Sequence, residues 1–160
     1  MAGRARRWLG AGLVIALPVA VGALGTIWTV DAIPTWYRAL EKPAWNPPDG
    51  LFGPVWTGLY LTMGVALWQV VRVWRRPGAA LAIVLFAIQL TLNLGWSWVF
   101  FGRRDIELGL IEIALLHVSI VATILAFGRV RRSAALLLIP YLAWVSFAAV
   151  LNAEILRLNG

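Results

Sequence analysis

The sequence predicts an all-α integral membrane protein, a five-transmembrane-helix bundle with a long first loop acting as a lid. Of its 160 residues, 61% are hydrophobic and only 13% are charged, and the mean hydropathy is +0.82. A soluble domain carries about 25% charged residues and a disordered chain is polar, so both classes are excluded. Because a spanning helix needs about 20 apolar residues, the chain has room for five or six spans, which we expect to form one domain over residues 1–160.

Five apolar stretches follow one another along the chain, each long enough to cross a hydrocarbon core of about 30 Å. They cover approximately residues 8–30, 52–74, 79–101, 106–127 and 134–156. Backbone polar groups must satisfy one another inside lipid, so each stretch is expected to be helical. The sequence lacks the alternating hydrophobicity that is typical of a membrane β-barrel.

Each span has a recognisable boundary. The first follows a basic N-terminal cluster and lacks a clean signal-peptidase site, which favours an uncleaved helix over a secretory signal. The second has Pro54 near its start, where a missing N–H costs little. Short basic breaks at 75–78, 102–105 and 129–133 separate the later spans. Loops this short predict that successive helices are antiparallel neighbours.

The distribution of the basic residues predicts how the chain is oriented in the membrane. Nine Lys and Arg residues fall on the side that holds the N-terminus and five on the other. This asymmetry predicts a cytoplasmic N-terminus, and the apolar helices favour the bacterial cytoplasmic membrane. The net charge of +7 is dispersed between spans, so no nucleic-acid partner is expected. Cysteine is absent and histidine occurs once, which excludes disulfides and multi-histidine metal sites within one chain.

The first connection, residues 31–51, is the longest and holds four prolines together with Trp36, Tyr37 and Trp45. Loops of about 20 residues are usually functional or disordered, and disordered linkers are poor in aromatic residues. The aromatic side chains could simply form an interfacial belt. We expect them to form a lid over a cavity between helices as well.

Polar and aromatic residues share helix faces at membrane depth, where an unpaired polar group is costly. They are Gln89, Asn93 and Trp96 in the third span, Trp144, Ala148 and Asn152 in the fifth, and Trp56 and Tyr60 in the second. The set favours a site for a flat, apolar ligand with a few polar edges. For any single Asn, a hydrogen bond between helices is the better explanation, and only the convergence of the whole set favours a ligand site.

Two ionisable residues lie in the interior of the fourth span, well past its first turn. Glu112 and His117 are about 140° apart around the helix, so they do not form a facing pair. A structural hydrogen bond is the favoured role for Glu112. Small residues repeat every four positions at Gly12, Ala16 and Ala20 and again at 87, 91 and 95, which indicates close helix contacts within the bundle or in a dimer.

The segment from Trp36 to Pro48, WYRALEKPAWNPP, resembles the first-loop motif of the TspO/MBR family of tryptophan-rich sensory and translocator proteins. Three further stretches match in order: WTGLYLTMG from Trp56, QLTLNLGWSWVFFG from Gln89 and PYLAWVSFAAVLN from Pro140. The resemblance covers nearly the whole chain and the same five-span layout. Trp96-Ser97-Trp98 departs from the family pattern and predicts a different end to the third helix.

This resemblance implies a five-helix bundle, usually a homodimer, that binds tetrapyrroles such as protoporphyrin IX and haem between its helices. It also implies a slow, light-dependent porphyrin-degrading activity in some bacterial members, with Trp56 and Trp144 in the positions of the two required tryptophans. The family's pocket Asn and third-span Trp match Asn93 and Trp96, and its fourth-span acid is Glu112 here. The fifth span lacks the tyrosine of the sterol-recognition segment, which argues against cholesterol binding.

We therefore expect a membrane receptor or sensor for porphyrin-type ligands, with no required cofactor and with the lipid bilayer as its environment. The predicted ligand-binding residues are Trp36, Trp45, Trp56, Tyr60, Gln89, Asn93, Trp96, Trp144, Ala148 and Asn152. Arg38 and Lys42 are the candidates for contact with propionates. The alternatives are a transporter of tetrapyrroles, sterols or other hydrophobic metabolites, an enzyme with turnover, and a scaffold whose tryptophans only pack.

Overall fold

The computed structural model describes residues 2–160, with side chains from residue 8 onward. Five helical stretches in it are long and apolar enough to cross a membrane: Trp8–Tyr37, Asp49–Val71, Ala79–Gly102, Ile106–Val130 and Arg132–Asn159. No strand occurs between residues 2 and 160. The predicted all-α, five-span architecture is confirmed.

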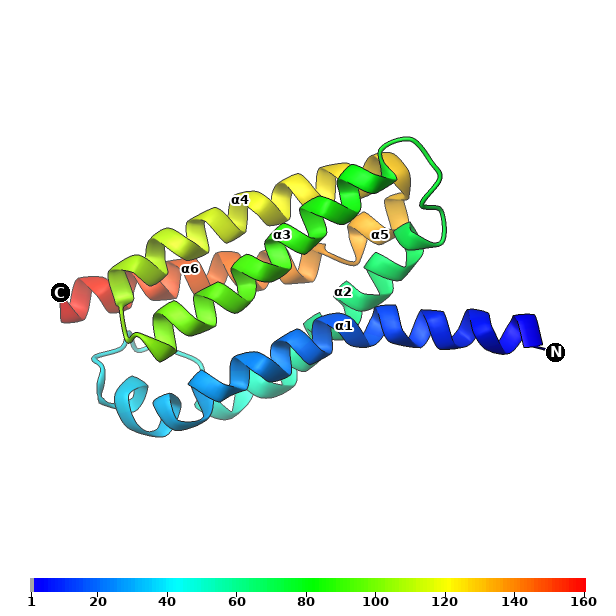
Figure 1. Ribbon diagram of the computed structural model, residues 1–160. Coiled ribbons are helices and arrows are strands. Elements are labelled where there is room, and N and C mark those ends of the chain that lie inside the picture. The colour runs from blue at the N-terminus through cyan, green and yellow to red at the C-terminus, as the bar shows by residue number, and fades with distance from the viewer. Residues whose placement is uncertain (1) are drawn as a thin grey trace.

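The elements follow in the order α1 (Ala2–Ala32), η1 (Ile33–Tyr37), η2 (Asp49–Leu51), α2 (Phe52–Val71), α3 (Ala79–Ser97), η3 (Trp98–Gly102), α4 (Ile106–Val130), α5 (Arg132–Leu136) and α6 (Ile139–Asn159). Helices α3 and α4 pack along one side of the bundle and α1 against α2 along another, with α6 against α4 (Figure 1). The loop after η1, the α3–α4 turn and the C-terminus lie at one end, which we call the lid end. The N-terminus, the α2–α3 turn and the α4–α5 junction lie at the other (Figure 1).

Two π-helical turns extend spans beyond their α-helices. In η1 the Arg38 N–H bonds to the Ile33 carbonyl, five residues back, and Pro34 occupies the first turn. A π turn accommodates a proline that has no N–H to donate. Residues 31–37, which the sequence placed in the loop, are therefore helical. In η3 the Arg103 N–H bonds to the Trp98 carbonyl at 2.8 Å, so the third span ends in a π turn.

The fifth span is two helices rather than one. Pro140 lies in the first turn of α6, where its missing N–H is tolerated, and the chain bends between α5 and α6. The main core fills the half of the bundle away from the lid, around Met63, Phe86 and Phe127, each at most 2% exposed. A smaller cluster around Tyr37 and Phe100 lies beneath the lid.

The close approach of α1 to α2 depends on glycine. A Cβ at Gly64 would overlap the backbone of Ile15, and a Cβ at Gly22 would overlap the ring of Tyr60. The predicted stripe of Gly12, Ala16 and Ala20 is instead exposed, so it makes no close contact within the bundle. On α3, by contrast, Gly95 packs against a neighbouring helix, as described below.

Candidate ligand-binding site

A cavity of about 370 Å³ lies beneath η1, enclosed by α1, α2, the α3–η3 segment and α6. Its volume is within the range of about 300–1,000 Å³ that is usual for small-molecule sites. Four predicted aromatic residues line it: Trp56, Tyr60, Trp96 and Trp144. The lining is mostly apolar, and none of its residues carries a charged side chain.

Aromatic rings form the walls on three sides. On α2, Trp56 stacks on Tyr60 with ring centroids 5.4 Å apart and planes 28° apart. On the α3–η3 side, Trp96 stacks on Phe100 at 5.1 Å and 18°. Trp144 of α6 meets Phe52 edge to face at 6.1 Å. Because these rings brace one another, each wall presents an ordered apolar surface to the cavity.

The fourth wall comes from α1 and is made of small and hydroxyl residues, chiefly Gly22, Gly25, Thr26 and Thr29. The hydroxyl of Thr26 donates to the Ala23 carbonyl at 2.6 Å, and that of Thr29 donates to the Thr26 carbonyl at 3.4 Å. A threonine hydroxyl that already donates keeps acceptor lone pairs. This wall therefore offers acceptors, which suit a ligand with N–H or O–H groups.

A buried hydrogen-bond network holds the deep end of the cavity. The Tyr60 hydroxyl donates to Asn93 Oδ1 at 2.6 Å, and Asn93 Nδ2 donates to the Tyr141 hydroxyl at 3.2 Å. Asn93 is 1% exposed and does not line the cavity. The Asn93 amide therefore joins α3 to α2 and α6 and holds the Tyr60 side chain in place. This is the hydrogen bond between helices that the sequence offered as the alternative to ligand contact.

Asn152 has both a structural and a lining role. Its Nδ2 donates to the Ile106 carbonyl at 2.9 Å, which ties α6 to the start of α4. Its Oδ1 accepts the indole N–H of Trp96 at 3.4 Å. Asn152 also lines the cavity, as does Ala148 one turn earlier on α6.

The first loop is fastened at several points. The Tyr37 hydroxyl donates to Asn46 Oδ1 at 2.9 Å. Asn159 of α6 donates to the Glu41 carbonyl at 2.9 Å and accepts from the Glu41 N–H at 3.0 Å. The Lys42 ammonium donates to the carbonyls of residues 37, 38 and 40 at 2.6, 3.2 and 2.9 Å, so it caps the end of the first span. These bonds hold the loop against the end of the bundle.

Six of the ten predicted ligand-binding residues line the cavity: Trp56, Tyr60, Trp96, Trp144, Ala148 and Asn152. Trp36 packs against Phe100 at 5.4 Å, outside the lining, and Trp45 packs against Phe147 at 5.8 Å with 47% exposure. Gln89 and Asn93 are buried elsewhere in the bundle. Arg38 is exposed at the lid end, and neither it nor Lys42 lines the cavity.

Gln89 differs from the other buried amides. It is 1% exposed, and both its Nε2 and Oε1 lack a hydrogen-bond partner among the described residues. A buried amide without partners costs several kcal/mol. It lies on the same face of α3 as Trp96, about two turns earlier, yet only Trp96 lines the cavity, so the shared helix face did not predict a shared site.

The contribution of α1 and of Phe52, Phe100 and Phe101 was not predicted. The sequence does contain a pattern that could have identified the α1 wall. Its small and hydroxyl residues Gly22, Gly25, Thr26 and Thr29 are spaced by three, one and three residues and share one helix face. Residues this small predict close packing between helices. That they line a cavity can be seen only when the positions of the neighbouring helices are known.

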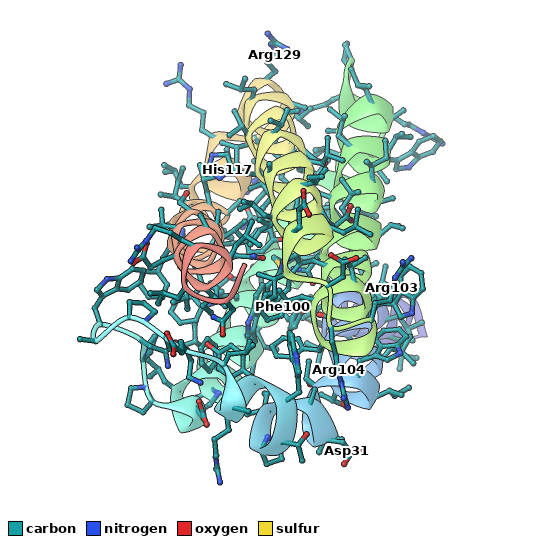
Figure 2. All side chains as sticks on the ribbon, turned by 90° about the vertical axis from the view of Figure 1, so that its left-hand side faces the viewer. Asp31, Phe100, Arg103, Arg104, His117 and Arg129 are labelled. Carbon is teal, nitrogen blue, oxygen red and sulfur yellow. The ribbon has the colours of Figure 1, made fainter. Side chains whose placement is uncertain are left out.

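The two ionisable groups in the interior of α4, Glu112 and His117, lie outside the cavity. His117 Nδ1 is 3.4 Å from the Ser146 hydroxyl, between α4 and α6 (Figure 2). Glu112 packs against α3, where a Cβ on Gly95 would lie 2.9 Å from its Oε1. The described residues contain no group of three or more His, Asp or Glu able to hold a metal ion.

Comparison with known proteins identifies relatives of nearly full length. The TspO/MBR family model matches residues 14–158. The tryptophan-rich protein TspO of Chlorobaculum tepidum is 52% identical over 148 residues, which cover 92% of this chain and 94% of that protein. The translocator protein of Bos taurus is 37% identical over 91% of this chain and 87% of its own. Protein CrtK of Rhodobacter capsulatus is 34% identical over 86% and 85%.

Proposed function

This chain belongs to the TspO/MBR family, and on that premise we propose that it is a receptor for flat hydrophobic ligands of the tetrapyrrole class, such as protoporphyrin IX. The observation that carries the proposal is the cavity itself, whose braced aromatic walls from α2, α3–η3 and α6 face a hydroxyl-bearing wall from α1. Stacking on Trp and Tyr faces favours a planar guest. The threonine oxygens of α1 can accept hydrogen bonds from O–H or N–H groups at the edge of a ligand.

The charge distribution bears on how such a ligand would be oriented. The cavity lining has no cationic side chain, so ionised propionates would remain at its mouth near the lid end. Arg38 is exposed there and is the better candidate for contact. Lys42 would first have to release the carbonyls that it caps. A complete macrocycle is expected to displace the lid, since the cavity lies near the lower end of the usual size range.

A receptor agrees better with the packing than a transporter does. Movement of a ligand from the cavity to the opposite end would require a path past Met63, Phe86 and Phe127, which are at most 2% exposed. The name of the bovine relative, translocator protein, keeps transport as the second candidate. Flux of a fluorescent porphyrin into proteoliposomes separates the two, because a receptor predicts binding without flux.

Light-dependent porphyrin degradation is a further candidate activity of the same cavity. Trp56 and Trp144 both line it, so a bound porphyrin would contact both indoles. Illumination of the complex, with Trp56→Phe and Trp144→Phe as variants, tests whether loss of porphyrin absorbance depends on them. Equal loss in the wild type and in both variants would remove this activity from the proposal.

The decisive experiment for the receptor is an equilibrium titration of the purified protein with protoporphyrin IX, followed by tryptophan quenching. Saturable quenching is expected in the wild type, and weaker binding in Trp144→Phe. Trp74→Phe is the matched control, because Trp74 is 61% exposed in the α2–α3 turn at the opposite end of the bundle. Non-saturable quenching, or equal affinities for all three proteins, would contradict the proposal.

A further inference from the structure

The end of the bundle opposite the lid carries a dense group of arginines. Arg72, Arg75 and Arg76 lie in the turn between α2 and α3, and Arg129, Arg131 and Arg132 lie at the α4–α5 junction. We call these six residues the arginine face. All seven acidic residues of the chain lie elsewhere, since the sequence has none between Asp49 and Asp105 or between Glu112 and Glu154. Figure 2 shows Arg129 projecting from the far end of α4, away from Arg103 and Arg104.

Hydrogen bonds hold the two halves of the arginine face together. Arg76 Nη1 donates to the Val130 carbonyl at 3.2 Å, which joins the α2–α3 turn to the end of α4. Arg131 Nε donates to Gln69 Oε1 at 3.0 Å, and the Ser133 hydroxyl donates to the same oxygen at 2.6 Å. Arg76 and Arg131 thus hold the α2–α3 turn and the α4–α5 junction together. The other four are free to meet a partner.

Those four guanidinium groups, of Arg72, Arg75, Arg129 and Arg132, are exposed and have no anionic partner among the described side chains. The Cζ of Arg72 lies 4.6 Å from the ring centroid of Trp68, and that of Arg75 lies 5.2 Å from Trp74. Tryptophan collects at the boundary between lipid and water. These contacts therefore place the two guanidinium groups at the level of lipid headgroups.

The surface around the arginines is suited to a lipid rather than to a small free anion. A depression at residues 72–77 combines three arginines with Val73, Trp74 and Pro77. On the helices at this end of the bundle, Leu81 at the start of α3 and Leu136 of α5 are 59% and 68% exposed. An inorganic phosphate would use only the guanidinium groups, whereas a phospholipid would also cover the exposed apolar side chains with its acyl chains.

We propose that the arginine face is a binding site for an anionic phospholipid, with the headgroup phosphate held by Arg72 and Arg75 and supported by Arg129 and Arg132. Arginine binds phosphate oxygens through paired N–H groups. Basic pockets between transmembrane helices are a recognised setting for such lipids. Because the site lies at the opposite end from the cavity, the lipid would act on bundle stability and on the α2–α3 and α4–α5 turns without entering the ligand site.

Native mass spectrometry of the detergent-solubilised protein, titrated with phosphatidylglycerol or phosphatidylcholine, tests this proposal. Retention of phosphatidylglycerol well above phosphatidylcholine is expected. Each arginine near an anionic lipid contributes about fivefold in affinity, so Arg72→Gln with Arg75→Gln is expected to weaken binding by more than tenfold. Arg103→Gln with Arg104→Gln removes the same charge at the lid end and is the matched control.

Three results would overturn the proposal. Equal weakening in both double variants would mean general charge attraction rather than a site. Equal retention of both lipids would remove the role of the headgroup charge. Stabilisation by inorganic phosphate that matches stabilisation by phosphatidylglycerol in a thermal-unfolding series would assign the face to a free anion. A second pair, Arg129→Gln with Arg132→Gln, gives an independent reading should the first pair express poorly.

Discussion

Gly22 provides a sharp test of how α1 forms the cavity, because a methyl group at this position has no space. In Gly22→Ala the new Cβ would overlap ring atoms of Tyr60. The ring has to shift to relieve this overlap, and a shift strains its 2.6 Å hydrogen bond to Asn93 and its stacking on Trp56. One substitution should therefore lower both the stability of the bundle and the affinity for a ligand.

The magnitude follows from three contributions. Overpacking of a filled interior costs about 1–3 kcal/mol, and loss of the Tyr60–Asn93 hydrogen bond costs about 1 kcal/mol. Replacing glycine by alanine in a helix returns about 0.5–1 kcal/mol. The expected net loss is about 1–3 kcal/mol of unfolding free energy, together with a clear fall in porphyrin affinity.

Two glycines of the same helix are matched controls. At Gly25, which also lines the cavity, the nearest atom to a new Cβ is Ser97 Oγ at 3.4 Å, and at Gly12 nothing lies within 4 Å. Gly25→Ala is expected to be near neutral and Gly12→Ala neutral or slightly stabilising. The assay is thermal unfolding in micelles followed by protoporphyrin titration. Equal behaviour of Gly22→Ala and Gly25→Ala would refute the reasoning.

Four further predictions concern single polar side chains. Asn93→Leu should lower stability by about 1–3 kcal/mol, read from thermal unfolding, because it leaves the buried Tyr141 hydroxyl and the half-buried Tyr60 hydroxyl without their partner. Gln89→Leu should leave stability unchanged or raise it in the same assay, since it removes an amide that has no partner; a large loss would contradict this. Asn159→Ala should speed amide exchange in residues 38–48, because it removes both bonds to Glu41; unchanged exchange would mean that the lid is held elsewhere. His117→Ala should leave the absorbance spectrum of bound haem unchanged, because His117 lies between α4 and α6 rather than at the cavity; a shifted Soret band would show axial ligation.

Most of the fold follows from hydropathy, because backbone N–H and C=O groups inside lipid must bond to one another, and a helix satisfies all of them within one segment. The five spans were predicted in the right places, and the exceptions are local. Pro34 reads as a loop residue, yet a π turn lets the helix continue to Tyr37. Pro140 lies within an apolar stretch that reads as one span, yet it separates α5 from α6. Both outcomes depend on how neighbouring helices pack around a proline.

The site was predictable where side-chain size and chemistry dominate. Trp56 and Trp144 line the cavity as expected, because large aromatic rings on inward faces leave few other arrangements. Gln89 was assigned to ligand contact because it shares a helix face with Trp96, and Lys42 because its ammonium group could meet a propionate. Gln89 is buried in the core about two turns before Trp96, and Lys42 caps backbone carbonyls; the depth of the cavity along α3 and the path of the loop decide these outcomes. The roles of these residues toward a ligand, like the homodimer and the membrane orientation, stay predictions.

The central claim is that a planar guest occupies the space between the aromatic walls and α1. Its most direct test is methyl NMR of threonine-labelled protein titrated with manganese protoporphyrin, whose paramagnetic centre broadens nearby signals. The claim predicts that Thr26, Thr29 and Thr57, which line the cavity, broaden first. Thr91, exposed on the outer face of α3, should keep its signal. Broadening of Thr91 before the cavity threonines would place the porphyrin on the outside of the bundle and contradict the account.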